Sequence, residues 1–398
     1  MQVLRVRRGM SRPVLAGLVG MSPSWVKQVE AGRLQTPKLP MILRIAEALR
    51  VRDLAELTGD QSPHVELFAG PGHARLPAVA AVINAFPLAA EDRAAPAAPH
   101  LRARLARAWA ARHASPHHRE AIGALLPGLI TDAQLAARQA ESAAQRRAAQ
   151  AVLAETWSLS QFFLAYQPDA ALLWRVAERG MVAAQESEDP HAIGVAAWLL
   201  AQAHRDAGPG HFEAADAVTL GTLRYLEPLL AEATDEVLAI AGALRFEAAY
   251  TAARRGDTGV AWGWWDRADE IARRLPADYF HPVTSFSRAI MGPHAVTVAV
   301  ELRAGGESVR QATASQDVAL PSRPRSARHR IERARGYHVA GQAETALATL
   351  ERAFEDAPET IRYNGHARSL ILEETEARSP ERRRRAAQLA VKVGLLAA

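Results

Sequence analysis

Apolar residues recur three or four positions apart along almost the whole chain, and no useful stretch alternates apolar with polar side chains. The first pattern is typical of amphipathic helices, and the missing second pattern is typical of strands. Alanine and leucine are abundant, and both favour helices. With 398 residues, the chain is long enough for one to three domains with substantial cores. We therefore predict an all-α protein.

The sequence contains no cysteine. This excludes a disulfide framework, thiolate zinc sites, iron–sulfur clusters and cysteine nucleophiles. No run of about 18 apolar residues is present, so no membrane-spanning helix is expected. The arginines near the N-terminus precede no apolar segment of the kind found in signal peptides. We expect a cytoplasmic protein with no membrane partner.

The positive charge of the chain is concentrated at its N-terminus. Residues 1–59 hold ten Lys and Arg against four Asp and Glu, whereas the remaining 339 residues hold 38 against 39. Arginine is preferred throughout, with 45 Arg and only three Lys, but this preference does not explain the segregation. A basic module on a neutral body is typical of a protein that binds a polyanion such as nucleic acid.

The basic module contains signals for two short helices joined by a tight turn. Ser11 is a good N-cap for the first helix, and Ser22, followed by Pro23, is a good start for the second. Gly20 permits the left-handed backbone that ends the first helix. This order predicts a helix-turn-helix, whose second helix enters the major groove of DNA.

The same residues resemble the Cro/C1-type, or XRE-like, helix-turn-helix family. The resemblance is carried first by Ser11-x-x-x-Leu15-Ala16, Gly20, Ser22 and Val26-x-x-Val29-Glu30-x-Gly32. It is carried further by Pro37, Leu39, Ile42, Ile45, Ala46, Leu49, Val51, Leu54 and Leu57, which match the last two helices. The resemblance implies a five-helix domain over residues 1–59. It also implies binding to double-stranded DNA as a homodimer on a near-palindromic operator.

The resemblance assigns roles to individual positions. Ser24 and Gln28 fall where the family reads base edges, Lys27 reaches a base or a phosphate, and Arg12 holds a phosphate. Trp25 either packs on the DNA backbone or is a half-buried packing residue, and Glu30 is an ion-pair partner rather than a DNA contact. The expected DNA-binding residues are Arg12, Ser22, Pro23, Ser24, Trp25, Lys27, Gln28, Arg33, Thr36 and Lys38.

Residues 60–115 are interpreted as a linker with connecting helices, and residues 116–398 as a second helical domain. Its helices alternate with turns, at periods near 35–45 residues, which favours stacked helical pairs. The turns are predicted at glycines and prolines, among them Gly123, Pro127, Gly128, Gly256 and Gly341. The segment 334–358 resembles a tetratricopeptide repeat, and segments 249–268 and 201–215 are weaker matches. We therefore predict a tetratricopeptide-like α-solenoid for sensing and dimerisation.

This domain order resembles transcriptional regulators of high-GC actinobacteria and, more remotely, peptide-sensing quorum regulators. Those peptide sensors clamp the peptide backbone with asparagines, and this chain has only Asn84 and Asn364. Aromatic residues of the body are candidates for an effector pocket that takes a small molecule or a peptide, or else for the solenoid core. The pocket candidates are Trp174, Trp198, Tyr250, Trp262 and Trp265.

The hypothesis is a dimeric transcriptional regulator whose DNA binding is modulated by a ligand or partner on the helical body. The alternative is a tetratricopeptide-like interaction scaffold, or a peptide-sensing quorum regulator, in which the helix-turn-helix is secondary. No nucleophile elbow, phosphate-binding loop or metal-ligand spacing occurs in the sequence. We therefore expect no catalytic site, cofactor or metal. The sequence does not identify the operator or the effector, or whether the protein activates or represses transcription.

Overall fold

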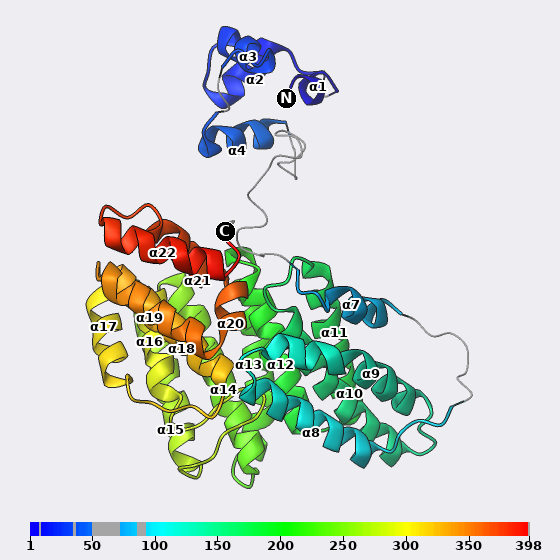
Figure 1. Ribbon diagram of the computed structural model, residues 1–398. Helices are drawn as coiled ribbons and strands as arrows, with labels where there is room; N and C mark the ends of the chain where they lie inside the picture. The colour runs from blue at the N-terminus through cyan, green and yellow to red at the C-terminus, as the bar shows by residue number, and fades with distance from the viewer. Residues whose placement is uncertain (8, 35–36, 50–71, 86–92, 397–398) are drawn as a thin grey trace. The chain divides into compact units, whose positions relative to one another are not determined.

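A computed structural model describes residues 1–398 except 8, 35–36, 50–71, 86–92 and 397–398. The chain divides into two compact units, residues 1–67 and 68–398, which we call the head and the body. Every regular element in the described ranges is a helix, as the sequence predicts (Figure 1).

The head consists of short helices around a small apolar core. Its described helices are α1 (Gln2–Arg7), α2 (Arg12–Val19), α3 (Pro23–Glu30) and α4 (Leu39–Ala48). The buried core residues are Leu15, Ala16, Val19, Val26, Ile45 and Leu49. The fifth helix predicted from the family resemblance falls among residues 50–71, outside the described residues.

The body is built from consecutive helices that pack on one another. Its first half comprises α7 (Leu76–Asn84), α8 (Ala98–Ala114), α9 (His118–Arg138), α10 (Ala143–Leu164), α11 (Ala170–Ser187), α12 (Pro190–Asp206) and α13 (Phe212–Leu226). Its second half comprises α14 (Asp235–Arg255), α15 (Thr258–Arg274), α16 (Met291–Glu301), α17 (Gly305–Ala314), α18 (Arg323–Val339), α19 (Ala343–Asp356), α20 (Pro358–Tyr363), α21 (Gly365–Glu374) and α22 (Pro380–Lys392). The turns predicted at Gly256 and Gly341 are confirmed, since both have left-handed backbone with φ of 88° and 76°.

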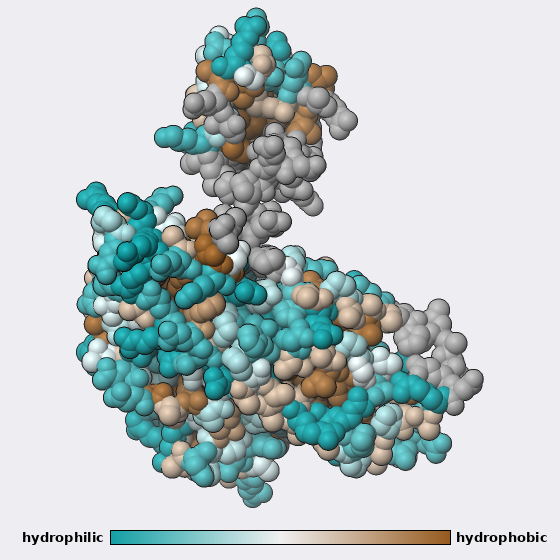
Figure 2. All heavy atoms as spheres, viewed as in Figure 1, coloured by the Kyte–Doolittle hydropathy of each residue, from teal (hydrophilic) through white to brown (hydrophobic). Residues whose placement is uncertain are grey.

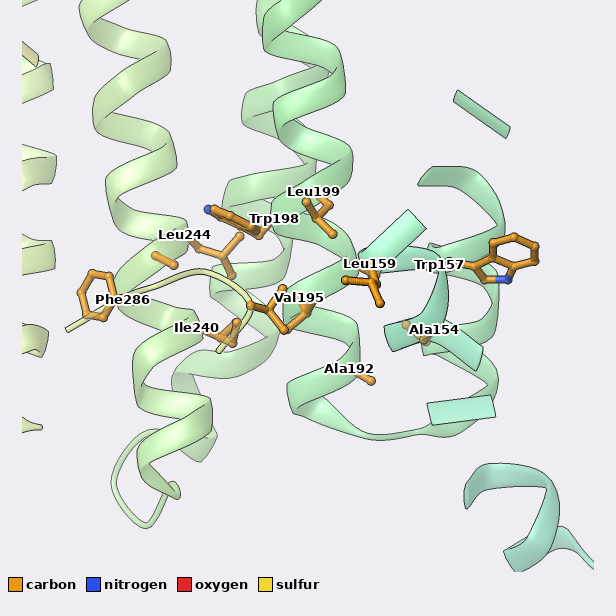
Figure 3. Close-up of a cluster of buried hydrophobic side chains, with 14 of the residues drawn as sticks. Ala154, Trp157, Leu159, Ala192, Val195, Trp198, Leu199, Ile240, Leu244 and Phe286 are labelled. Carbon is orange, nitrogen blue, oxygen red and sulfur yellow. The ribbon is translucent and has the colours of Figure 1, made fainter. Parts of the chain in front are cut away.

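Two apolar clusters form the core of the body. The larger extends from α7 to α16, and the smaller from α16 to α22. Figure 3 shows part of the larger cluster, where Trp198 of α12 lies near Leu244 of α14. At two places a glycine leaves room for a neighbouring buried side chain. A Cβ on Gly194 would lie 2.2 Å from Ile240, and one on Gly242 would lie 2.2 Å from Phe286.

Helices from the beginning of the body contact helices near its end. The carboxylate of Glu359, at the start of α20, accepts hydrogen bonds from the backbone N–H groups of Arg119 (2.5 Å) and Glu120 (3.4 Å) in the first turn of α9. A carboxylate is favoured there because the first N–H groups of a helix are unpaired and its dipole is positive. His113 of α8 also lies 2.9 Å from Ser322, the N-cap of α18. These contacts go beyond the neighbour-to-neighbour packing that defines a simple solenoid.

One sequence expectation fails within α9. Gly123, Pro127 and Gly128 predict breaks in the chain, but α9 continues through all three. Buried apolar residues on both sides of Pro127 anchor the helix, among them Ile122 and Ile130. The missing side chain of Gly123 makes room for Phe163, whose ring would lie 2.7 Å from an added Cβ. Tertiary packing therefore outweighs the single backbone hydrogen bond that proline removes.

Hydrophilic residues are interspersed with small apolar areas on the visible face of the body (Figure 2). Among the helices that the structure describes, none is both long enough and apolar enough to cross a membrane.

Candidate nucleic-acid interface

The α2–α3 unit is fixed by local hydrogen bonds at each helix end. The Ser11 hydroxyl accepts from the Val14 N–H (3.4 Å), and the Ser22 hydroxyl accepts from the Trp25 N–H (3.1 Å). Between the helices, Gly20 adopts φ 71°, and the Met21 N–H donates to the Ala16 carbonyl (2.9 Å). Such a left-handed residue with backward hydrogen bonds closes a helix C-terminus. The caps and the turn predicted from Ser11, Gly20 and Ser22 are confirmed.

One face of α3 is polar and open to solvent. Ser24, Lys27 and Gln28 are exposed, and their spacing of three and four places them on one side of the helix. Val26 is fully buried on the opposite side and joins the core of the head. Ser22 and Pro23 are exposed at the N-terminal end of α3. This arrangement leaves the N-terminal end of α3 and one of its faces available to a partner.

Trp25 is half-buried and packs against the apolar core of the head. The sequence left two roles open for Trp25, and its contact with this core supports the role of a packing residue within the head. The indole is still partly accessible, so a contact with the DNA backbone stays a prediction.

A buried carboxylate holds α1, α2 and α3 together. The side chain of Glu30, at the end of α3, is 1% exposed. It forms ion pairs with Arg5 of α1 (Nε–Oε1, 2.6 Å) and with Arg12 of α2 (Nε–Oε2, 2.7 Å). Burial acts to raise the pKa of Glu30, but the hydrogen bonds and charges of the two arginines outweigh it and lower that pKa. The predicted ion-pair role of Glu30 is confirmed. Arg12 is predicted to bind a DNA phosphate. In the structure its Nε group pairs with Glu30, and 37% of its side chain is exposed.

The remaining predicted contacts lie between α3 and α4. Arg33 and Lys38 are exposed, and Thr36 lies outside the described residues. The charges of the segment that we expect to grip the DNA backbone are therefore accessible where the structure describes them.

The capped helices, the left-handed turn and the exposed face of α3 define a helix-turn-helix domain, a DNA-binding class of fold. A family model described as "Helix-turn-helix domain" matches residues 1–58 of the chain. Neither the curated proteins nor the solved structures contain a match to the chain.

The five aromatic residues predicted to line an effector pocket are not gathered at one place. Trp262 and Trp265 pack edge to face with ring centroids 5.9 Å apart. Trp198 is buried beside Phe162, and Trp174 packs against two histidines, His204 and His211. Tyr250 alone of the five lines a small cavity between α14, α16 and α18.

That cavity is also bordered by charged residues of α18 that no sequence motif singled out, namely Arg325, Arg328, His329 and Glu332. Their spacing of three, four and seven along a helix is a signal that predicts one shared face. No cluster of three metal-ligating side chains occurs among the residues that the structure describes.

Proposed function

We propose that this protein is a sequence-specific, DNA-binding transcriptional regulator of the XRE-like type. In this proposal α3 lies in the major groove, with Ser24 and Gln28 at base edges and Lys27 at a base or phosphate. Arg33 and Lys38 hold the DNA backbone. The single observation that carries the proposal is the exposed polar face of α3, which follows a capped helix and a left-handed turn at Gly20.

The charge distribution supports the same proposal. The excess of Lys and Arg over Asp and Glu lies within residues 1–59. Contacts between cations and phosphates release counterions, so DNA affinity should fall steeply as the salt concentration rises. A cytoplasmic location follows from this function.

We further propose that the protein binds as a homodimer to a near-palindromic operator. One head of this size offers only one short recognition helix, and two half-sites about one helical turn apart give useful affinity. The body, which we infer to be tetratricopeptide-like because of hairpins such as α14–α15 and α18–α19, supplies dimerisation and senses a ligand or partner. No catalytic role is proposed.

The test is selection of bound DNA from random and genomic fragments by the full-length protein, followed by titration of the recovered site. We expect a near-palindrome. Gln28→Ala should weaken binding by about 1–3 kcal/mol and relax the preference at one base pair of each half-site. Lys27→Ala should weaken binding to all sequences and lower the salt slope.

Two exposed residues of the head provide matched controls. Gln2→Ala on α1 and Arg44→Ala on α4 change the same kinds of side chain away from α3. They should leave the sequence preference unchanged. If no DNA is enriched, or if all four variants bind alike, the proposal is wrong, and capture of a protein partner by the body would then favour the scaffold alternative.

A further inference from the structure

Helix α18 carries more positive charge than its buried position explains. It contains six arginines and two histidines against one glutamate, yet it packs against α8, α16, α17 and α19. A cation inside a protein is costly unless a counterion or several hydrogen bonds accompany it. The partners of each cation therefore decide whether the helix is electrically balanced.

Two carboxylates account for part of this charge. Glu332 is 3% exposed and pairs with Arg328 (2.7 Å) and Arg335 (2.6 Å), and Glu301 of α16 also pairs with Arg335 (2.8 Å). Burial acts to raise the pKa of Glu332, but the charges of Arg328 and Arg335 prevail and lower it to about 2. Two carboxylates thus match two guanidinium groups.

Arg325 is left over from this balance. Its Nη2 donates to the carbonyl of Thr284 (2.6 Å), and no carboxylate among the described residues pairs with it. Arg112 of α8 is a second buried cation without a carboxylate in the described part of the chain; it is 8% exposed and lies over the Phe162 ring at 4.2 Å. Burial, followed by the nearby charges of Arg325 and Arg119, lowers the pKa of Arg112 to about 9. Burial also lowers the pKa of Arg325, to about 10. Both groups are therefore cationic at neutral pH.

An unused donor of α18 lies beside the cavity. The Nη1 atom of Arg328 is buried without a hydrogen-bond partner in the described ranges. Buried donors of this kind are uncommon and call for an acceptor. His329 is 7% exposed and also borders the cavity, and its ring already has the backbone of Ser315 as a hydrogen-bond partner.

The cavity has the size of a small group rather than of a peptide. Its volume is about 50 Å³, which accommodates a few water molecules or one compact anion. Phe246 and Tyr250 form an aromatic wall, and the ring of His294 is stacked on Phe246 with centroids 3.4 Å apart. Aromatic rings of α14 and donors of α18 therefore both line the cavity.

We propose that this cavity binds a small oxyanion, the carboxylate or phosphate group of a metabolite, through Arg325 and Arg328, with His329 beside them in the cavity lining. A guanidinium group suits both anions, because its planar donors match two oxygens at once. The anion would supply the negative charge that Arg325 lacks and an acceptor for the Nη1 group of Arg328. This inference stands on the body alone and does not depend on DNA binding.

The test is isothermal titration of the full-length protein with sodium phosphate, acetate and benzoate in separate runs. Ionic strength is held constant with sodium chloride, because general screening must not be mistaken for binding. Saturable binding of at least one of these anions is expected, together with a rise in the melting temperature that depends on its concentration. Phosphate alone points to a phosphorylated ligand, and acetate or benzoate to a carboxylic acid.

Arg325→Gln should weaken the binding at least tenfold, and His329→Gln should weaken it less. The matched control is Arg323→Gln on the same helix, where the exposed side chain reaches the Asp356 carbonyl instead of the cavity. It should bind as the unchanged protein does. Circular dichroism verifies folding, and His329→Gln replaces Arg325→Gln as the deciding variant if the latter unfolds. Absence of saturable binding, or equal losses in the control and cavity variants, would overturn the proposal.

Discussion

The head and the body both depend on arginine, but they place it in different surroundings. In the head, Arg33 is exposed, and Arg5 and Arg12 share the carboxylate of Glu30. In the body, Arg112 and Arg119 are almost fully buried, and Arg205 is buried against Glu247. A solvated arginine is available to an external polyanion, whereas a buried one requires an internal partner. The difference teaches that net charge locates a DNA-binding surface only where the charges reach solvent.

The two regions also differ in histidine. Of the 14 histidines, only His64 falls within residues 1–67, and it lies outside the described residues; the other 13 lie between positions 73 and 366. Burial is the main cause that lowers the pKa of His113, His329 and His366 to about 4 each, although for His329 the backbone of Ser315 acts in the opposite sense. Mild acid should therefore lower the stability of the body and leave that of the head unchanged.

The largest expected effect is a selective loss of body stability between pH 7 and pH 5. Above about pH 6.5 each of these histidines is neutral in both the folded and the unfolded state, and stability does not depend on its protonation. As the pH falls toward 4, the unfolded state takes up a proton that the folded state does not. Each histidine therefore lowers the free energy of unfolding by about 2 kcal/mol at pH 5. Glu155 acts in the opposite sense, because burial raises its pKa to about 7, which adds about 2 kcal/mol over the same range. These four groups together should give a net loss of at least about 3 kcal/mol. Burial also lowers the pKa of His118, His281 and His294, and this adds to the loss.

The head should be unaffected over that range, since the lowered pKa of Glu30 matters only below about pH 4.5. Urea titrations with a short deuterium pulse, read peptide by peptide, follow both units at each pH. His329→Gln should reduce the pH dependence of the body, whereas His117→Gln, at an exposed position, should not. Equal pH dependence in head and body peptides would contradict the comparison.

The second effect tests the ion pair of the head. Glu30→Gln leaves Arg5, which is 7% exposed, without its carboxylate. We expect a loss of about 3 kcal/mol of head stability, because removing one partner leaves a buried charge unpaired. Deuterium exchange should increase in α2 and α3 and stay unchanged in the body. Glu47→Gln, at an exposed site on α4, is the control, and the interpretation fails if it destabilises the head equally.

The smallest effects concern helix contacts in the body and have opposite signs. Gly242→Ala places a methyl group 2.2 Å from the buried Phe286 ring, which should cost about 1–3 kcal/mol. Gly263→Ala on α15 meets nothing within 4 Å, so it should stabilise the helix by up to about 1 kcal/mol. Urea denaturation of both variants measures the difference. A neutral Gly242→Ala would show that α14 and Phe286 are not closely packed.

Local signals in the sequence were sufficient for much of the head. Ser11, Gly20 and Ser22 act on backbone groups only three or four residues away, so their roles follow from spacing alone. The same local rule failed in α9, where Pro127 lies within a helix that packing holds on both sides. It also gave no guide to the aromatic residues of the body, because Trp174, Trp198 and Trp262 belong to different helix contacts.

The sequence by itself determined that the chain is helical, that its excess positive charge lies at the N-terminus, and that α3 follows a helix-turn-helix turn. Those properties depend on composition and on interactions between near neighbours in the chain. Tertiary structure decided that Glu359 caps α9 across 240 positions. It also decided that Arg325 of α18 lies beside a cavity with no carboxylate partner among the described residues. The physical reason is that the cost of a buried charge depends on groups far away in the sequence, which no local pattern records.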